Sequence, residues 1–364
     1  MKIKAAVARE KGKLTFEELE LGEPRLGEVL VKLTACGVCH TDTTVLNQDM
    51  PTPLPMVLGH EGVGVVEQVG PGVTELQVGD HVIISFPFCG HCEPCLDGRP
   101  YAGDRSTGLF FFGGYEDGTR RITDANGAEI GSLFGQGSLA DHCVAAARAC
   151  VKVDPEADLK QLCSLACGAQ TGSGVVLNKQ KPRPGDAYAV FGCGAVGFSA
   201  IMAAKLAGCS TIIAVDVVPS RLELAKECGA THVINGKECA DVPAEIKRLT
   251  GGRGVHFALE AAGLGILVKQ MLRSMRPDGY AMVVSFAGDV PLNASMDLVG
   301  SSVTLGGTVE GASNPQVFIP RLVQYYQEGR FPVDKLSRFY RFDELEKALE
   351  DSHKGTAIKP IIVF

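Results

Sequence analysis

The sequence predicts an α/β protein made of two domains, a compact β-barrel and a doubly wound parallel sheet. Three observations support this fold class. The 364-residue chain is long enough to bury two separate cores. Its first 150 residues contain short β-branched runs separated by glycine, proline and aspartate, without regularly spaced helices. From about residue 165 to residue 305, strand-like and helix-like segments alternate, as in a parallel sheet covered by helices.

The first domain begins with strands that are evident in the sequence. The runs at residues 29–33, 63–67 and 81–84 are rich in valine, leucine and isoleucine. Residues 70–73 and 77–80 carry the glycines, with proline or aspartate, that turns require. Short strands joined by tight turns predict a barrel.

A long polar, glycine-rich segment follows, from Asp97 to Gly137, and we expect it to be irregular. It contains the run Phe110-Phe111-Phe112. An irregular stretch of this length in a compact domain is usually functional or anchored by a ligand. Two interpretations of the aromatic run stay open: a local packing cluster that fixes the segment, or an apolar lip over a substrate cleft.

The second domain is predicted to hold six strands, at residues 187–190, 211–215, 232–234, 255–260, 280–285 and 303–305. Helices are expected between them at residues 221–228, 244–249 and 266–275. Two more helices, 315–328 and 342–351, and a strand at 358–363 should return to the first domain. The predicted bounds are therefore 1–165 and 306–364 for the first domain, and 166–305 for the second.

A glycine-rich turn, Phe191-Gly192-Cys193-Gly194-Ala195-Val196-Gly197, joins the first of these strands to a helix, and the next strand ends in Asp216. This order is the one that a dinucleotide-binding βαβ unit requires. Gly192 permits the tight turn, Gly194 lets the backbone approach a pyrophosphate, and Gly197 lets helix and strand pack closely. Backbone N–H groups at the helix start, including that of Val196, would face the phosphates. Asp216 lies 24 residues beyond Gly192, where a carboxylate can accept both ribose hydroxyls of NAD.

The charge and hydropathy of the chain exclude several partners. A net charge of −7 argues against nucleic acid or an anionic membrane, because both attract basic surfaces. No apolar run approaches the ~20 residues needed to span a bilayer. The N-terminus leads into a strand-like run rather than a signal peptide. We therefore expect a soluble, cytoplasmic protein that acts on a small molecule.

Thirteen cysteines are many for such a protein, and their spacing points to metal ligation rather than disulfides. Cys89, Cys92 and Cys95 form a C-x2-C-x2-C run. Other cysteines are scattered singly and are typical of small buried thiols.

Three separated segments offer ligands of the kind that zinc prefers. They are Gly-Val-Cys39-His-Thr-Asp, Gly-His60-Glu and Ala-Cys167-Gly. Two thiolates and one imidazole with a fourth position left open form a known catalytic zinc arrangement. Each residue alone also has an ordinary interpretation, as a buried thiol, a strand-end histidine or a helix-start cysteine. Together, in a chain with a dinucleotide fold, they indicate a zinc site.

Over essentially its whole length the chain resembles the zinc-containing alcohol dehydrogenases of the medium-chain dehydrogenase/reductase superfamily. The resemblance is carried by residues 37–42, 59–61 and 192–197, by the cysteine run, and by Ala357-Ile358-Lys359-Pro360. Phe134-Gly135-Gln136-Gly137-Ser138 and the long preceding loop are most similar to aryl- or benzyl-alcohol dehydrogenases. The resemblance implies a GroES-like β-barrel catalytic domain and a Rossmann cofactor domain.

The resemblance also implies roles at the catalytic site. Cys39, His60 and Cys167 would hold a zinc ion, a Lewis acid that lowers the pKa of a bound alcohol. The alcohol would then give a hydride to the nicotinamide and its proton to Thr41. Asp42 would orient His60 through its second ring nitrogen, and Glu61 would lie beside the metal.

For the cofactor, the resemblance implies that His40 and Lys359 face the pyrophosphate and supply positive charge to it. Thr171 would lie near the nicotinamide. Asp216 would select NAD, because its charge would repel the 2′-phosphate of NADP. Arg221 has two open interpretations, a contact with the adenosine ribose or a solvated residue at a helix start.

The sequence departs from the family pattern at two positions. Thr44 stands where many members carry a histidine as the outer proton relay, so we expect the relay to end at the ribose and water. The structural zinc run of the family, C-x2-C-x2-C-x7-C, would place its fourth cysteine at Gly103. A site completed by the neighbouring Asp104 and a weakened lobe with three free thiols are the alternatives.

The leading functional prediction is an oxidoreductase that uses zinc and NAD to interconvert a primary, aromatic or otherwise apolar, alcohol and its aldehyde. An NADPH-dependent aldehyde reductase of the same fold and an inactive dinucleotide-binding protein are the alternatives. Asp216 argues against the first, and the intact zinc ligands and Thr41 argue against the second. We also expect a homodimer or homotetramer in which sheets join edge to edge near residues 303–305.

Overall fold

The computed structural model describes residues 1–364, which fold as two compact units. The first unit contains residues 1–167, 314–324 and 333–364, and the second contains residues 168–313 and 325–332. The predicted bounds lie at 165/166 and 305/306, whereas the structure puts residues 306–313 and 325–332 in the second unit and residues 166–167 in the first. The second unit continues past its last strand because Glu310 is buried there, where its Oε2 accepts a hydrogen bond from Gln170 Nε2 at 3.1 Å.

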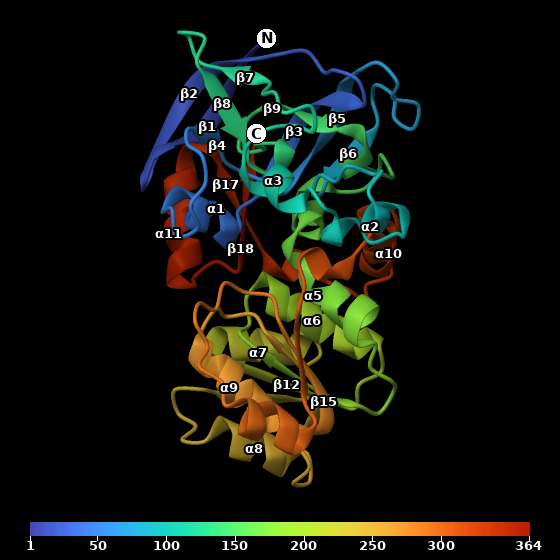
Figure 1. Cartoon of the computed structure of the whole chain (residues 1–364), viewed down its shortest axis with the longest axis vertical. Helices are drawn as coiled ribbons and strands as arrows, with labels where there is room; N and C mark the ends of the chain where they lie inside the picture. The colour runs from blue at the N-terminus through green and yellow to red at the C-terminus, as the bar shows by residue number, and fades with distance from the viewer. The chain divides into compact units, whose positions relative to one another are not determined.

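The first unit is built from a closed barrel and a seven-stranded sheet (Figure 1). The barrel strands, in spatial order, are β1 (Lys2–Glu10), β2 (Lys13–Leu21), β7 (Ile122–Thr123), β8 (Glu129–Ser132) and β4 (Met56–Val57). The sheet runs β10 (Cys150–Val153), β6 (His81–Ile84), β5 (Gly62–Val69), β3 (Glu28–Gly37), β18 (Lys359–Val363) and β17 (Ser337–Arg341), with β9 (His142–Ala146) also paired to β3. The strands at 29–33, 63–67 and 81–84 are thus confirmed.

The expectation of an irregular segment over residues 97–137 is wrong in part. This stretch contains a short helix, α3 (Ser106–Phe111), and the two barrel strands β7 and β8. The strands have only two and four residues, too few to give a recognisable alternation of apolar and polar residues in the sequence. They are held instead by pairing, because β2 and β8 both bond to β7.

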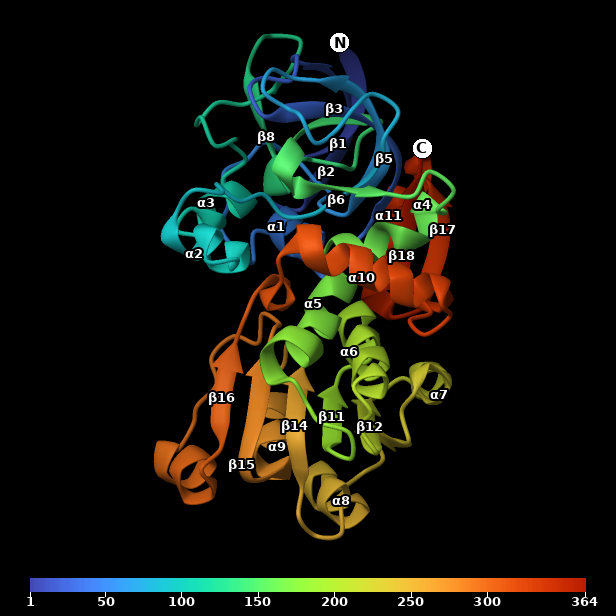
Figure 2. The same ribbon diagram turned by 90° about the vertical axis from the view of Figure 1, so that its right-hand side faces the viewer.

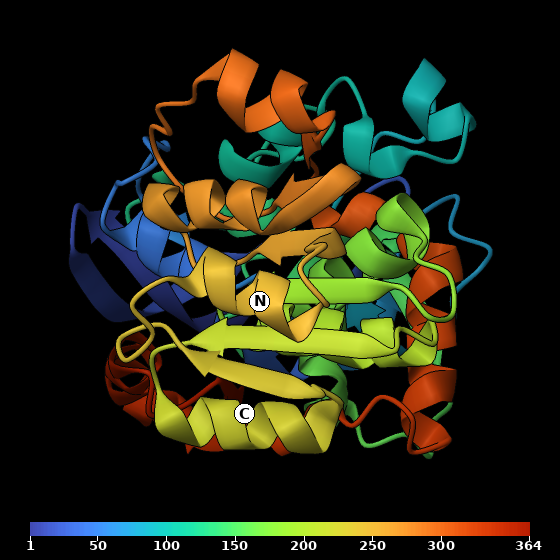
Figure 3. The same cartoon turned by 90° about the horizontal axis from the view of Figure 1, so that it is seen from below.

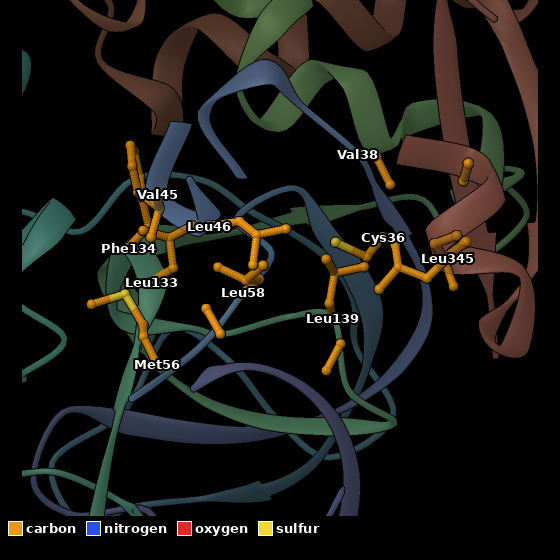
Figure 4. Close-up of a cluster of buried hydrophobic side chains, with 14 of the residues drawn as sticks. Cys36, Val38, Val45, Leu46, Met56, Leu58, Leu133, Phe134, Leu139 and Leu345 are labelled. Atoms are coloured by element: carbon orange, nitrogen blue, oxygen red, sulfur yellow. The ribbon is translucent and has the colours of Figure 1, made fainter. Parts of the chain in front are cut away.

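The short helices of the first unit are α1 (His40–Leu46), α2 (Glu93–Leu96) and α4 (Leu159–Leu162). Two longer ones, α10 (Pro315–Gln327) and α11 (Leu345–Lys354), come from the C-terminal part. An apolar core joins the barrel to α1, α3 and α11. Figure 4 shows part of it, with Leu58 and Leu139 in the middle, Val45 and Phe134 toward one end and Leu345 toward the other. Burying a side chain of this size contributes about 1.5–3 kcal/mol.

The second unit is a six-stranded sheet in which every paired strand is parallel (Figure 2). Its order is β13 (His232–Asn235), β12 (Thr211–Asp216), β11 (Ala187–Phe191), β14 (Val255–Glu260), β15 (Met275–Val283) and β16 (Thr304–Gly307). The chain starts at β11 in the middle, builds outward to β13, and then returns to build β14 to β16 on the other side. The doubly wound parallel sheet is therefore confirmed, and its strand order reverses beside β11.

Helices cover both faces of this sheet (Figure 3). They are α6 (Ala195–Leu206), α7 (Pro219–Cys228), α8 (Val242–Leu249) and α9 (Gly265–Ser274), whereas α5 (Gly168–Gly174) packs on α6. The inner strands β11, β12 and β14 are mostly buried, which explains the near-continuous apolar runs of the sequence at these positions. None of the helices in either unit combines the length and the apolar character that crossing a membrane requires.

Candidate active site

The first zinc-type segment lies between β3 and α1. Cys39 is the residue before α1, and its backbone N–H donates to Asp42 Oδ2 at 3.0 Å, which caps the helix start. Strand β18 runs alongside, because Val38 N–H donates to Pro360 O at 2.9 Å. The end of the chain therefore helps to fix the position of Cys39.

The other two segments converge on Cys39. His60 and Glu61 immediately precede β5, and Cys167 follows a short 3₁₀ turn, Cys163–Ala166. Ser85, just after β6, fixes that turn by donating from Oγ to Ala166 O at 3.0 Å. The ligand atoms of Cys39, His60, Glu61 and Cys167 all lie within 4.8 Å of one another. Residues more than a hundred positions apart in the sequence are thus brought together within the first unit.

The histidine of this cluster is oriented by Asp42. His60 Nδ1 lies 3.2 Å from Asp42 Oδ1, and the same oxygen accepts the Gly59 N–H at 2.9 Å. Because a carboxylate only accepts, Nδ1 carries the proton toward it. The other ring nitrogen, Nε2, is buried and has no hydrogen-bond partner. Two thiols, a carboxylate and an unpartnered imidazole nitrogen fit a zinc ion.

The electrostatics of the cluster favour a cation. The pKa of the Cys39 thiol is held well below its ordinary value by a hydrogen bond with Cys167, which outweighs the opposing effect of burial, with further help from His60. Burial opposes charge on His60, but Asp42 outweighs it and raises the pKa of the imidazole well above its usual range. The cluster therefore favours a thiolate at Cys39 and a positive charge at His60. A metal cation can take the place of the protons that these two side chains would otherwise hold.

Glu61 is part of an ion pair as well as of the cluster. Lys359, the first residue of β18, places Nζ 2.8 Å from both Glu61 oxygens, and both side chains are almost fully buried. The carboxylate fits only because residue 37 is glycine, where a Cβ would come within 2.1 Å of Glu61 Oε2. The resemblance had implied that Lys359 faces the pyrophosphate, and that role stays a prediction. What the structure adds is a lysine that neutralises Glu61.

The remaining predicted residues of this region lie on α1. Thr41 Oγ1 is 3.8 Å from Cys39 Sγ, at the edge of the cluster, and His40 is exposed. Thr44 is buried, and its hydroxyl donates to His40 O at 3.0 Å. Because this hydroxyl is committed to the helix backbone, Thr44 is not placed to extend a proton relay.

The aromatic run forms a packing cluster that reaches His60 of the candidate metal site. Phe110 is 3% exposed and stacks on Phe134, with ring centroids 4.6 Å apart and planes at 12°. Phe134 in turn lies 4.8 Å from the His60 ring. Phe111 is half-buried and meets Phe134 edge-on, whereas Phe112 is 55% exposed. The packing interpretation therefore holds for Phe110.

The cysteine run forms a second cluster, in which the thiols of Cys89, Cys92 and Cys95 lie within 4.8 Å of one another. The carboxylate of Asp104 is outside this group, so the structure does not bring it in as the fourth ligand. The backbone of Asp104 reaches the lobe instead, since its hydrogen bond to Cys92 lowers the pKa of that thiol. A Cβ on Gly103 would lie 3.2 Å from Cys95 Sγ, the direction from which a fourth cysteine would enter.

In the second unit the three glycines of the turn meet different surroundings. Gly192 has φ +99°, which favours glycine, and a Cβ there would come within 2.8 Å of the Ala262 Cβ. A Cβ on Gly197 would lie 1.8 Å from Gly192 O. A Cβ on Gly194 would meet nothing within 4 Å. Two glycines are thus needed for the fold. Gly194 faces open space, and its approach to a pyrophosphate stays a prediction.

Asp216 closes this turn. Its Oδ2 accepts the Cys193 N–H at 2.6 Å, and its Oδ1 accepts the N–H groups of Val217 and Val218 at 2.7 and 2.9 Å. Three backbone donors fix the carboxylate at the end of β12 while leaving it further acceptor capacity.

Two other predicted cofactor residues also lie in the second unit. Arg221 is close enough for its charge to act on Cys193. Thr171 is buried on α5.

Both halves of the chain match known family models. Residues 25–155 match the alcohol dehydrogenase GroES-like domain, and residues 195–324 match the zinc-binding dehydrogenase domain. The chain is 40% identical to a geraniol dehydrogenase of Castellaniella defragrans, over 99% of this chain and 97% of that one. The chain belongs to the zinc-containing alcohol dehydrogenases.

Solved structures agree with this assignment. This alcohol dehydrogenase is 43% identical to benzyl alcohol dehydrogenase from Acinetobacter calcoaceticus, with a TM-score of 0.95 over 100% of this chain and 99% of that chain. A zinc-binding domain protein of the family from Burkholderia ambifaria is 44% identical over the same shares, with a TM-score of 0.96. The predicted family and its likeness to benzyl-alcohol dehydrogenases are confirmed.

Sequence reasoning missed two sets of contacts in this dehydrogenase. It used Phe134 and Gln136 only as marks of a subfamily, although the structure places both against His60. It also missed the pairing of Lys359 with Glu61. The available signal was a lysine at the start of an apolar strand, since a buried lysine requires a partner.

Proposed function

We propose that this zinc-containing alcohol dehydrogenase oxidises primary alcohols that carry an aromatic or similarly apolar group to their aldehydes, with NAD as the hydride acceptor. The observation that carries the proposal is the buried cluster of Cys39, His60, Glu61 and Cys167, in which His60 Nε2 has no hydrogen-bond partner. A zinc ion held there would lower the pKa of an alcohol at the site.

The chain's own residues supply the rest of the chemistry. Asp42 fixes the His60 tautomer and so keeps Nε2 available. We expect Thr41, whose Oγ1 lies 3.8 Å from Cys39 Sγ, to take the alcohol proton outward. Lys359 balances the Glu61 carboxylate, so that the cluster does not carry an uncompensated negative charge.

The apolar-substrate proposal is supported by what surrounds the cluster. Phe134 contacts the His60 ring, and Phe110 and Phe111 extend the aromatic surface. Similar proteins are named for benzyl alcohol and geraniol, both primary alcohols whose reacting carbon lies next to a π system. A developing aldehyde next to a π system is stabilised by conjugation, which suits such substrates to this reaction.

The NAD proposal rests on Asp216. Its carboxylate is held at the end of β12 by three backbone N–H groups, and its negative charge would repel a 2′-phosphate. Arg221, the third residue of α7 and five residues beyond Asp216, keeps NADPH as the second candidate, because an arginine near this position can pair with that phosphate.

Steady-state rates with benzyl alcohol, geraniol and ethanol, each with NAD and with NADP, test the proposal. We expect kcat/KM for benzyl alcohol and geraniol to exceed that for ethanol, and NAD to be preferred. Asp216→Ser should reduce the ratio of kcat/KM with NAD to kcat/KM with NADP. A preference of the unaltered enzyme for NADP would overturn the cofactor assignment, and a preference for ethanol would overturn the substrate class.

A further inference from the structure

The segment Phe134–Ser138 runs beside the segment Gly59–Gly62, which carries two residues of the metal-binding cluster. We propose that Phe134 and Gln136 are positioning residues that fix the imidazole of His60 for metal binding. The inference rests on the proposed function in one respect, that His60 is a metal ligand.

Phe134 contacts the ring of His60 directly. The two centroids are 4.8 Å apart and the planes are inclined by 31°. Phe134 is itself held in place, stacked on Phe110 on one side and met edge-on by Phe111 on the other. Its side chain is 5% exposed. The imidazole therefore has a firm aromatic surface beside it rather than a mobile side chain.

The backbone at Phe134 is unusual. Its φ is +52°, a left-handed conformation that costs free energy for a residue with a Cβ. Gly135 and Gly137 share positive φ values, so this short segment turns sharply twice. The surrounding contacts hold Phe134 in that conformation, and its ring is consequently directed at His60.

Gln136 holds the backbone of the same histidine. Its Nε2 donates to His60 O at 3.2 Å and to Ser85 O at 3.2 Å, and its Oε1 accepts the Gly62 N–H at 3.2 Å. The side chain is 1% exposed, so these bonds do not compete with water. Ser85 also donates to Ala166 O, next to Cys167. One amide thus connects the strand end carrying His60 to the turn carrying Cys167.

The two segments approach each other closely. Ser138 N–H donates to Gly59 O at 3.0 Å. A Cβ on Gly59 would lie 2.2 Å from Leu139 N, and one on Gly62 would lie 2.6 Å from Ser138 Cβ. Glycines on both sides of His60 and Glu61 therefore permit the contact with residues 134–139.

These contacts leave the imidazole little freedom. Asp42 holds Nδ1, Phe134 covers a side of the ring, and Gln136 fixes the backbone carbonyl. Only Nε2 lacks a partner. Loss of the aromatic ring at position 134 would open space beside His60, so that the imidazole could tilt and hold a metal ion less well.

The test compares four variants by the rate at which bound zinc passes to a chromogenic chelator. Phe134→Leu should release the catalytic ion about tenfold faster or more, the range expected for the loss of a supporting contact. Phe134→Tyr, which keeps the ring, should stay within about threefold of the unaltered enzyme. Phe110→Leu removes a ring that supports Phe134 without stacking on His60 and should have a smaller effect than Phe134→Leu. Phe86→Leu, which removes a ring that meets Phe110 but not Phe134, is the matched control. Equal release rates for Phe134→Leu and Phe86→Leu would overturn the proposal.

The experiment separates this inference from the proposed function. Cys39→Ser identifies the release phase that belongs to the catalytic cluster, and only that phase is compared. If Cys39→Ser removes no phase, the metal assignment itself is wrong. If the phase exists and Phe134→Leu leaves it unchanged, only the positioning role is wrong. If Phe134→Leu does not fold, Gln136→Met takes its place. The readout is then the absorption spectrum of the cobalt-substituted protein, compared with that of the cobalt-substituted unaltered enzyme. An unchanged spectrum would contradict the proposal.

Discussion

Lys359 Nζ lies 2.8 Å from each carboxylate oxygen of Glu61, and neither side chain is more than 2% exposed. Burial opposes the charge on Lys359, but Glu61 outweighs it and raises the pKa of the lysine above its ordinary value. Burial raises the pKa of the Glu61 carboxyl, and the positive charge of Lys359 opposes that shift. The pair joins the C-terminal strand β18 to the candidate metal site of this alcohol dehydrogenase, across nearly three hundred residues of sequence.

Removing one member of this pair should cost more than removing both. We expect Lys359→Met to lower the free energy of unfolding by about 3–5 kcal/mol, because it leaves a buried carboxylate without its cation. Lys359→Met combined with Glu61→Gln should cost less than the sum of the two single changes. Urea-induced unfolding of the four proteins measures this coupling. Lys226→Met, which breaks an exposed pair with Glu223, is the control and should change stability by less than about 1 kcal/mol. If the loss of unfolding free energy in the double variant equals the sum of the losses in the two single variants, the two side chains are not coupled and the prediction is wrong.

Two glycines of the dinucleotide turn should respond differently to the same substitution. Gly194→Ala should fold normally, because its φ of −85° suits alanine and its Cβ would meet open space, yet weaken NAD binding by about tenfold or 1.4 kcal/mol. Gly197→Ala should destabilise the fold by about 1–3 kcal/mol or more, since the Cβ would collide with Gly192 O. Thermal unfolding and NAD titration measure both effects. Unchanged NAD affinity in a folded Gly194→Ala protein would contradict the prediction that the backbone at Gly194 lies close to the pyrophosphate of NAD.

A cysteine at position 103 should complete the second metal cluster. Gly103 has φ −63° and ψ 145°, which any residue adopts, and its Cβ would point to within 3.2 Å of Cys95 Sγ. We expect Gly103→Cys to slow zinc release from this lobe by about tenfold, because four thiolates enclose a structural zinc better than three. Asp104→Asn should leave that release unchanged, since the carboxylate lies outside the cluster. Faster zinc release from the Asp104→Asn variant would indicate that the Asp104 carboxylate is a zinc ligand after all.

The C-terminal helix should make a pH-dependent contribution to stability through Asp351. Hydrogen bonds from Lys347 and Tyr340 lower the pKa of this carboxyl to about 2, from an ordinary value of 3.8. Because the pKa is depressed in the folded protein, the stabilisation is fully present above about pH 4 and is lost as the pH falls toward 2. The stability difference between the unaltered protein and Asp351→Asn should therefore shrink over that window. Urea unfolding of both proteins at several pH values measures this difference. A stability difference that does not change with pH would contradict the lowered pKa of Asp351.

The two-domain fold and the catalytic cluster were predictable from sequence for physical reasons. Parallel strands buried on both faces leave apolar runs, and the glycine turn needs its residues where they are, so both are visible locally. Cys39, His60 and Cys167 could be grouped without coordinates because two thiolates and one imidazole form a known catalytic zinc set, in a chain with a dinucleotide fold. Association into dimers or tetramers and a cytoplasmic location stay predictions.

What sequence could not supply depended on distances between remote residues. The strands β7 and β8 are too short to carry a pattern and exist because neighbouring strands pair with them. Asp104 was a reasonable ligand by spacing, yet its backbone and not its carboxylate reaches the cysteines. The contact between Phe134 and His60 depends on a left-handed residue, which no rule for phenylalanine anticipates.

The central claim is that zinc held by Cys39, His60 and Cys167 is required for NAD-dependent alcohol oxidation. The direct measurement is the initial rate of benzyl alcohol oxidation with NAD, with zinc content determined on the same sample, before chelation, after chelation and after zinc is restored. We predict that activity falls as the catalytic zinc is lost and returns when it is restored. Retained activity in a sample shown to be free of zinc would contradict the account.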